Sequence, residues 1–62
     1  MKRRDLLRYL RQHGCRFVRE GGDHSIWENP ATKCRSAVPR HREIPEHTVA
    51  RICKQLGIPV PA

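Results

Sequence analysis

The chain has 62 residues, enough for one small domain, predicted to span residues 1–62, and too few to line a deep cofactor pocket. A chain of this size buries only about 60% of the surface that its unfolded form exposes, so its core is expected to be thin. Thirteen Lys and Arg residues against six Asp and Glu give a formal net charge of +7. This excess favours a polyanionic partner, either nucleic acid or an anionic membrane surface, although it can also serve solubility alone. The membrane is the weaker candidate, because no apolar run approaches the roughly 18 residues of a spanning helix.

The three cysteines, Cys15, Cys34 and Cys53, form neither a C-x-x-C pair nor a short Cys/His spacing typical of zinc. A disulfide scaffold would need an even number and usually a secretory signal. The N-terminus starts basic, but Arg8 and Arg11 interrupt the apolar stretch that such a signal requires. We therefore expect a reduced, cytoplasmic protein without a metal site or a small-molecule cofactor.

The first predicted element is a helix over residues 3–13. Leu6, Leu7 and Leu10 recur at helical spacing between a charged start and Gly14. Gly14 suits the left-handed conformation that ends many helices.

Three short strands are predicted next, over residues 15–20, 24–28 and 33–38. Gly21-Gly22 separates the first two, and a turn around Asn29-Pro30 separates the second from the third. Such tight turns favour an antiparallel meander. Trp27 lies three residues after His24, so the two side chains should face opposite sides of the sheet, with Trp27 in the core. Phe17 and Tyr9 are expected in the core as well.

A second helix should begin around Ile44-Pro45-Glu46, since proline suits a first helical turn and the acidic side chain complements the helix dipole. It carries an apolar stripe and ends at Gly57. The predicted fold class is therefore α+β, with the order α-β-β-β-α and a three-stranded antiparallel sheet carrying both helices on one face. This order is that of the double-stranded-RNA-binding fold, although a fold does not by itself define a function.

Two segments carry a more specific signal, GGDHSIW at residues 21–27 and AVPRHREIP at residues 37–45. Here the sequence resembles the HicA family, also called YcfA-like proteins. Members commonly show a Gly-Ser-His turn into the second strand, a Val-Pro-x-His segment after the third, and a last helix ending near Leu-Gly-Ile. The corresponding residues in this chain are Gly22-Asp23-His24, Val38-Pro39-Arg40-His41 and Leu56-Gly57-Ile58.

The resemblance implies an RNA-cleaving toxin, an mRNA interferase, that a HicB-like antitoxin protein keeps silent. It also implies that His24, entering the second strand from the turn at Gly22 and Asp23, is catalytic. The chain departs from the family pattern at Asp23, where serine is usual. An anion at this position either orients His24 or repels the RNA phosphate.

His24 also suits this chemistry without reference to a family. RNA carries its own nucleophile, the 2′-hydroxyl, so its cleavage needs proton transfer and stabilisation of a crowded phosphate. Histidine titrates near neutral pH and can accept or donate that proton. The non-catalytic alternative for His24 is a surface histidine at a strand edge that makes an ordinary hydrogen bond. His41 is either a second proton carrier or phosphate donor, or a solvated loop residue.

Several basic side chains could hold the RNA backbone, which would position the substrate without reading its bases. The alternative is a solvated polar sheet face. The candidates are Arg19, Lys33, Arg35, Arg40, His41 and Arg42.

Three hypotheses remain open from the sequence. The first is a ribonuclease toxin with His24 as general acid or base. The second is a non-catalytic RNA-binding module, in which replacing His24 would leave RNA binding intact. The third is a chain whose basic face serves an acidic protein partner.

Overall fold

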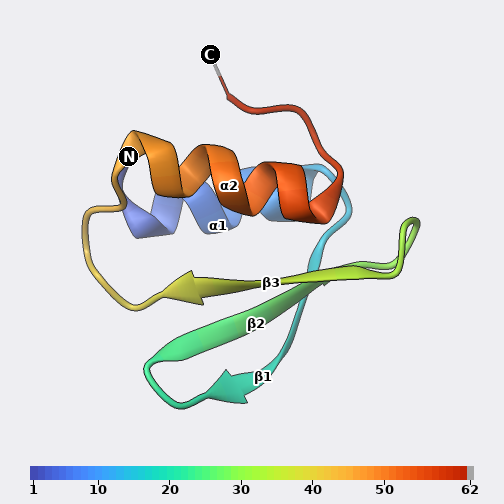
Figure 1. Ribbon diagram of the computed structural model, residues 1–62, viewed down its shortest axis with the longest axis horizontal. Coiled ribbons are helices and arrows are strands. Elements are labelled where there is room, and N and C mark those ends of the chain that lie inside the picture. The colour runs from blue at the N-terminus through green and yellow to red at the C-terminus, as the bar shows by residue number, and fades with distance from the viewer. Residues whose placement is uncertain (62) are drawn as a thin grey trace.

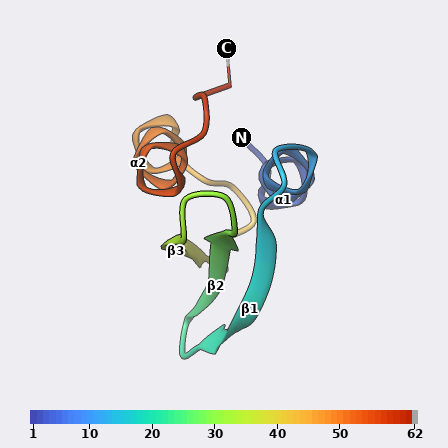
Figure 2. The same cartoon turned by 90° about the vertical axis from the view of Figure 1, so that its right-hand side faces the viewer.

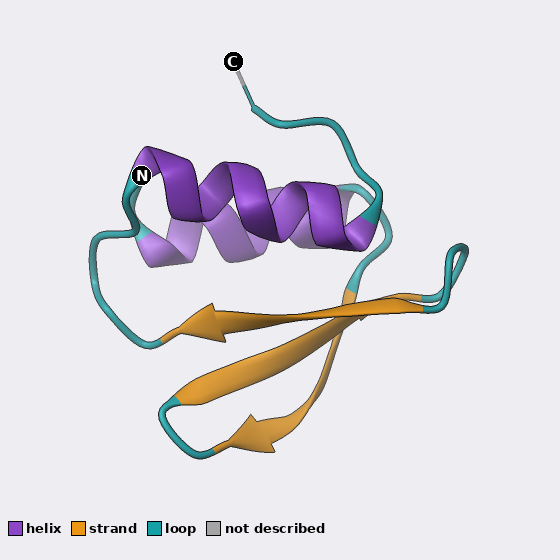
Figure 3. Ribbon diagram, in the orientation of Figure 1, coloured by secondary structure: helices purple, strands orange, loops and turns teal. Residues whose placement is uncertain are grey.

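The computed structural model describes residues 1–61, which form two helices and one three-stranded sheet (Figures 1 and 3). The elements follow in the order α1 (Arg3–Gln12), β1 (Arg16–Gly21), β2 (His24–Asn29), β3 (Cys34–Pro39) and α2 (Glu46–Leu56). The predicted α+β order α-β-β-β-α is confirmed, and it is compatible with a double-stranded-RNA-binding-like fold.

The sheet has the order β1-β2-β3, and both neighbouring pairs are antiparallel. Its register places His24 opposite Gly21 on one side and opposite Pro39 on the other. At the other end of the same strand, Asn29 lies opposite Cys34. His24 therefore lies at the end of the sheet where β3 leaves toward α2.

Both helices cover one face of the sheet, as predicted, and leave the other face open (Figure 2). The core between these layers contains the stripe of α2, two leucines of α1 and inward-facing residues of β2 and β3. Its buried members are Leu6, Leu10, Cys15, Trp27, Val38, Ile44, Val49, Ile52, Cys53, Leu56 and Ile58. Alternation along β2 puts Ser25 and Trp27 on this covered face. His24 and Glu28 consequently occupy the positions of the open face.

Polar contacts hold the C-terminal end of α2 against the end of the sheet that lies farthest from His24. The buried Asn29 side chain donates from Nδ2 to the Leu56 carbonyl at 2.8 Å, which satisfies a carbonyl at the end of the helix. Ser36 donates from Oγ to Gln55 Oε1 at 2.6 Å. Gly57 then takes a positive φ of 73° as the helix ends, the conformation that glycine permits at low cost.

Two strand starts differ from the prediction by one residue. Cys15 closes α1 rather than opening β1, because its amide donates to the Leu10 carbonyl at 2.9 Å. Lys33 belongs to the turn before β3, where it has a positive φ of 65° and its amide donates to the Asn29 carbonyl at 2.8 Å. In both places the backbone amide donates to a nearby carbonyl and not to a neighbouring strand, so the strand begins one residue later than predicted.

The prediction that Phe17 belongs to the core is wrong, since its side chain is 49% exposed. β1 is an edge strand that runs away from the helices (Figure 2). Its register also shifts between Phe17 and Arg19. The Phe17 ring therefore contacts the core only edge-on, with its centroid 6.1 Å from that of the buried Trp27. The predictions for Trp27, fully in the core, and for Tyr9, packed partly buried against it, are confirmed.

Within residues 1–61, neither helix has the length and apolar character that crossing a membrane would require.

Candidate nucleic-acid interface and active site

His24 lines an open hollow at one end of the sheet. The turn at Gly22 and Asp23 brings the chain into β2, and Gly22 takes the positive φ of 68° that the turn requires. The hollow has a volume of about 320 Å³. Its lining, which we call the histidine hollow, consists of Asp23, His24, Pro39, Arg40 and His41.

The histidine hollow unites residues from two separate segments of the chain. Because His24 pairs with Pro39 across the sheet, the two residues that follow Pro39 arrive beside the imidazole. Arg40 and His41 are exposed, as is His24. The hollow thus combines two imidazoles and one guanidinium, groups that can transfer a proton and neutralise a phosphate, with the carboxylate of Asp23.

A chain of hydrogen bonds supports the rim of this hollow from the helix side. Arg3 donates from Nε to the Pro39 carbonyl at 3.0 Å and from Nη2 to Ser25 Oγ at 2.8 Å. The buried Ser25 hydroxyl donates in turn to Glu20 Oε1 at 3.0 Å, and Glu20 forms a salt bridge with Arg40. These contacts tie α1 to all three strands, and they hold Arg40 over the β1–β2 hairpin.

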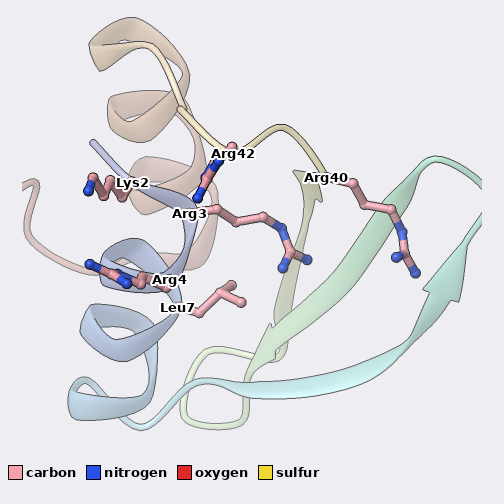
Figure 4. A pocket seen from close by; sticks show the side chains of 6 residues that line it. All are labelled: Lys2, Arg3, Arg4, Leu7, Arg40 and Arg42. Carbon is pink, nitrogen blue, oxygen red and sulfur yellow. The ribbon is translucent and has the colours of Figure 1, made fainter.

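A second hollow, of about 440 Å³, lies between the start of α1 and the segment after β3 (Figure 4). Figure 4 shows Arg3 extending from α1 toward β3, and Arg40 extending from the segment after β3 toward the β1–β2 hairpin. We call it the basic hollow, and its lining is Lys2, Arg3, Arg4, Leu7, Arg40 and Arg42. Arg40 therefore lines both hollows.

The basic residues assigned to RNA binding from the sequence fall into separate groups. Arg40 and His41 share the histidine hollow with His24, and Arg42 lines the basic hollow beside it. Arg19 lies on β1 opposite Ile26, two positions along β2 from His24. The structure thus brings three of the candidates to one end of the sheet.

Lys33 and Arg35 are not brought together with His24. The register places Cys34 opposite Asn29, five residues along β2 from His24. At a rise of about 3.3 Å per residue this separates the two ends of the strand by roughly 16 Å. Any RNA contact of Lys33 would therefore lie far from the imidazole.

Three basic residues at the start of α1 were not predicted to belong to the site, namely Lys2, Arg3 and Arg4. Their run of positive charge is visible in the sequence, but it has the ordinary appearance of a solvated helix start. Only the pairing of this segment with residues 42–44 places it beside the loop after β3.

Glu28 organises the charges on the open face of the sheet. Its side chain is only 10% exposed, and Oε1 lies 2.9 Å from Arg16 Nη2 while Oε2 lies 3.4 Å from Arg35 Nε. The hydrogen bond from Arg16 and the neighbouring Arg35 charge hold the pKa of Glu28 below its ordinary value, against the opposing effect of burial. Arg35 is thus engaged in an intramolecular salt bridge.

We expect this pairing to make stability depend on acid pH. Since the pKa of Glu28 is lower in the folded chain, its contribution is complete at neutral pH and is lost as the pH falls below about 4. Glu28→Gln should lower the free energy of unfolding at pH 7 and flatten its decline between about pH 5 and 3. Urea denaturation across this range measures both effects. Glu43→Gln, at a carboxylate that is 67% exposed, is the control, and equal slopes for the two variants would contradict the assignment.

The described part of the chain, residues 1–61, contains no group of three or more His, Cys, Asp and Glu side chains placed to hold a metal ion. Two of the three thiols, Cys15 and Cys53, are buried, and burial raises the pKa of each. A buried thiol with a raised pKa is a poor nucleophile at neutral pH. The titratable side chains of the histidine hollow, by contrast, are exposed.

A family model described as "HicA toxin of bacterial toxin-antitoxin" matches residues 3–58. No curated protein and no solved structure matches the chain. The matched span includes every helix and strand, and it contains the whole histidine hollow. The chain therefore belongs to the HicA toxin family, the toxins of bacterial toxin–antitoxin systems, and this membership implies an antitoxin partner.

Proposed function

We propose that this toxin is an endoribonuclease that cleaves mRNA in the cytoplasm without a metal ion, with His24 as its catalytic residue. The observation that carries the proposal is the histidine hollow, where the exposed imidazole of His24 lies beside Arg40 and His41. Family membership supports the toxic activity, and the net charge of +7 suits a polyanionic substrate.

The proposed reaction is an intramolecular displacement at phosphorus. His24 accepts the proton of the 2′-hydroxyl, whose oxygen attacks the adjacent phosphorus and forms a 2′,3′-cyclic phosphate. The bond from phosphorus to the 5′-oxygen breaks, and this leaving oxygen takes a proton from an acid such as His41 or water. Arg40 would offset the negative charge on the phosphate oxygens, as guanidinium groups do well through paired hydrogen bonds.

The same chemistry defines the substrate class. DNA has no 2′-hydroxyl, so it lacks the nucleophile and should not be cut. Arg and Lys contacts to the RNA backbone carry no base information. These residues would therefore not determine which RNA sequences are cut.

We further propose a HicB-like protein as the antitoxin. An inhibitor of this activity would cover His24 and the neighbouring cations, and acidic side chains would match their charge. Pairing of opposite charges accelerates such encounters and makes them sensitive to salt.

Cleavage of a purified labelled RNA in excess EDTA tests the ribonuclease proposal. The native chain should produce fragments with 2′,3′-cyclic phosphate ends, because the 2′-hydroxyl is the nucleophile. An RNA carrying a single 2′-deoxynucleotide at a mapped cleavage site should be spared at that site alone. Cleavage that stops in EDTA, or that continues at the deoxy position, would contradict the mechanism.

A non-catalytic RNA-binding module is the second candidate. The basic hollow favours it, since its five cations could bind a backbone without any help from a histidine. Under this alternative no fragments form in the same assay, while the native chain still binds the RNA.

A further inference from the structure

We propose that the basic hollow is a second backbone subsite, which binds the phosphate next to the one being cleaved. This inference rests on the proposed RNA substrate, and it assigns residues of α1 to that substrate. One strand of RNA would pass from the histidine hollow over Arg40 into the basic hollow.

The backbone builds this subsite by joining two segments that are about 40 residues apart in sequence. Arg3 donates its amide to the Arg42 carbonyl at 2.9 Å, and Ile44 donates its amide to the Met1 carbonyl at 2.7 Å. Lys2 and Glu43 form an antiparallel bridge between them. The side chains of Lys2, Arg4 and Arg42 therefore start from a paired backbone and not from loose termini.

Most of the positive charge of the basic hollow is not neutralised from within the described residues, since Arg40 alone among its five cations forms a salt bridge, with Glu20. None of the six acidic side chains lines it. Among residues 1–61, Lys2, Arg4 and Arg42 form no salt bridge, and all three are exposed. Such a concentration of cations attracts an anion and repels other cations.

The composition of the lining favours phosphate over a single carboxylate. Four of the five cations are Arg, whose planar donors bind phosphate oxygens in pairs. Leu7 adds an apolar wall on which a sugar or base can rest. Because Arg40 belongs to both hollows, a phosphate held in one lies next to a phosphate held in the other.

Arg4 and Arg42 are the residues to test, because they line only the basic hollow and take no part in the hydrogen bonds of the Arg3 side chain. The Arg42 contact to Arg3 uses its carbonyl, so a side-chain change leaves it in place. The double variant Arg4→Gln/Arg42→Gln is matched by Arg51→Gln/Lys54→Gln, which removes the same charge from α2, outside both hollows.

Two substrates distinguish an effect on binding at the subsite from an effect on the cleavage step. A dinucleoside monophosphate has only the scissile phosphate, whereas a longer single-stranded RNA also presents its neighbour. For the longer RNA, the Arg4/Arg42 variant should bind roughly tenfold more weakly than the control variant. The slope of log K against log salt should flatten by about 0.7 for each phosphate that the variant no longer neutralises. For the dinucleotide the two variants should cleave at the same rate.

The results distinguish failure of the subsite from failure of the ribonuclease. Equal binding of long RNA by both double variants would overturn the subsite, whatever the native chain cleaves. Weaker binding by the Arg4/Arg42 variant alone would support the subsite even where no cleavage occurs. A loss of antitoxin binding with unchanged RNA binding would assign the basic hollow to the acidic partner and overturn the proposal.

Discussion

Replacing His24 by alanine is expected to slow RNA cleavage by about 10²–10⁴-fold, the usual contribution of a general acid or base. The fold should persist, because the imidazole is exposed and lies outside the core. Binding of the same RNA should change little, since Arg40 and the basic hollow retain their cations. Single-turnover rates on a labelled RNA measure the first effect, and titration under non-cleaving conditions measures the second.

Two further histidine variants make this result specific. His47→Ala removes an exposed imidazole from the first turn of α2, outside both hollows, and should cleave like the native chain. His41→Ala tests the neighbour in the histidine hollow, and a loss as large as that of His24→Ala would identify the two as an acid–base pair. If His24→Ala cleaved at the native rate, the catalytic assignment would fail.

Replacing Ile52 by alanine is expected to lower the free energy of unfolding by about 2–5 kcal/mol, because it opens a cavity at a fully buried position of α2. Domains are stable by roughly 0.05–0.15 kcal/mol per residue, which gives about 3–9 kcal/mol for 62 residues. The loss is thus of the same order as the whole stability. Circular dichroism in urea should show a midpoint far below that of the native chain, or no folded baseline.

The adjacent exposed residue supplies the control for this core substitution. Arg51→Ala changes the same helix on its solvent side and should shift stability by no more than about 0.5 kcal/mol. A bound antitoxin would raise the apparent stability of the Ile52 variant in proportion to its occupancy. Equal midpoints for Ile52→Ala and Arg51→Ala would contradict the position of Ile52 in the core.

Most of the fold could be predicted from sequence because local signals and tertiary contacts agree. The apolar stripe of α2, the glycine at its end and the tight turns between strands each point to the structure that forms. The errors lie where a local hydrogen bond determines which element a residue joins, or where an edge position determines whether a side chain is buried. Cys15 donates its amide to the end of α1, and Phe17 stays exposed on an edge strand whose register shifts beside it.

The candidate site was only partly accessible to the same reasoning. Asp23 and His24 are neighbours in the sequence and line one hollow, and the register of β2 with β3 brings Arg40 and His41 to them. Arg3 gave no comparable signal, since its place beside Pro39 and Ser25 depends on how α1 packs over the sheet. Patterns of hydrophobicity describe which face a helix buries, but not which loop its first turn meets.

Arg40 occupies the border between the two hollows and already binds one carboxylate, that of Glu20. A single acidic group presented at this border, as Glu20 is, thus contacts the cation that both hollows share. If RNA binds as proposed, a second carboxylate delivered there by another molecule would obstruct the histidine hollow and the basic hollow at once.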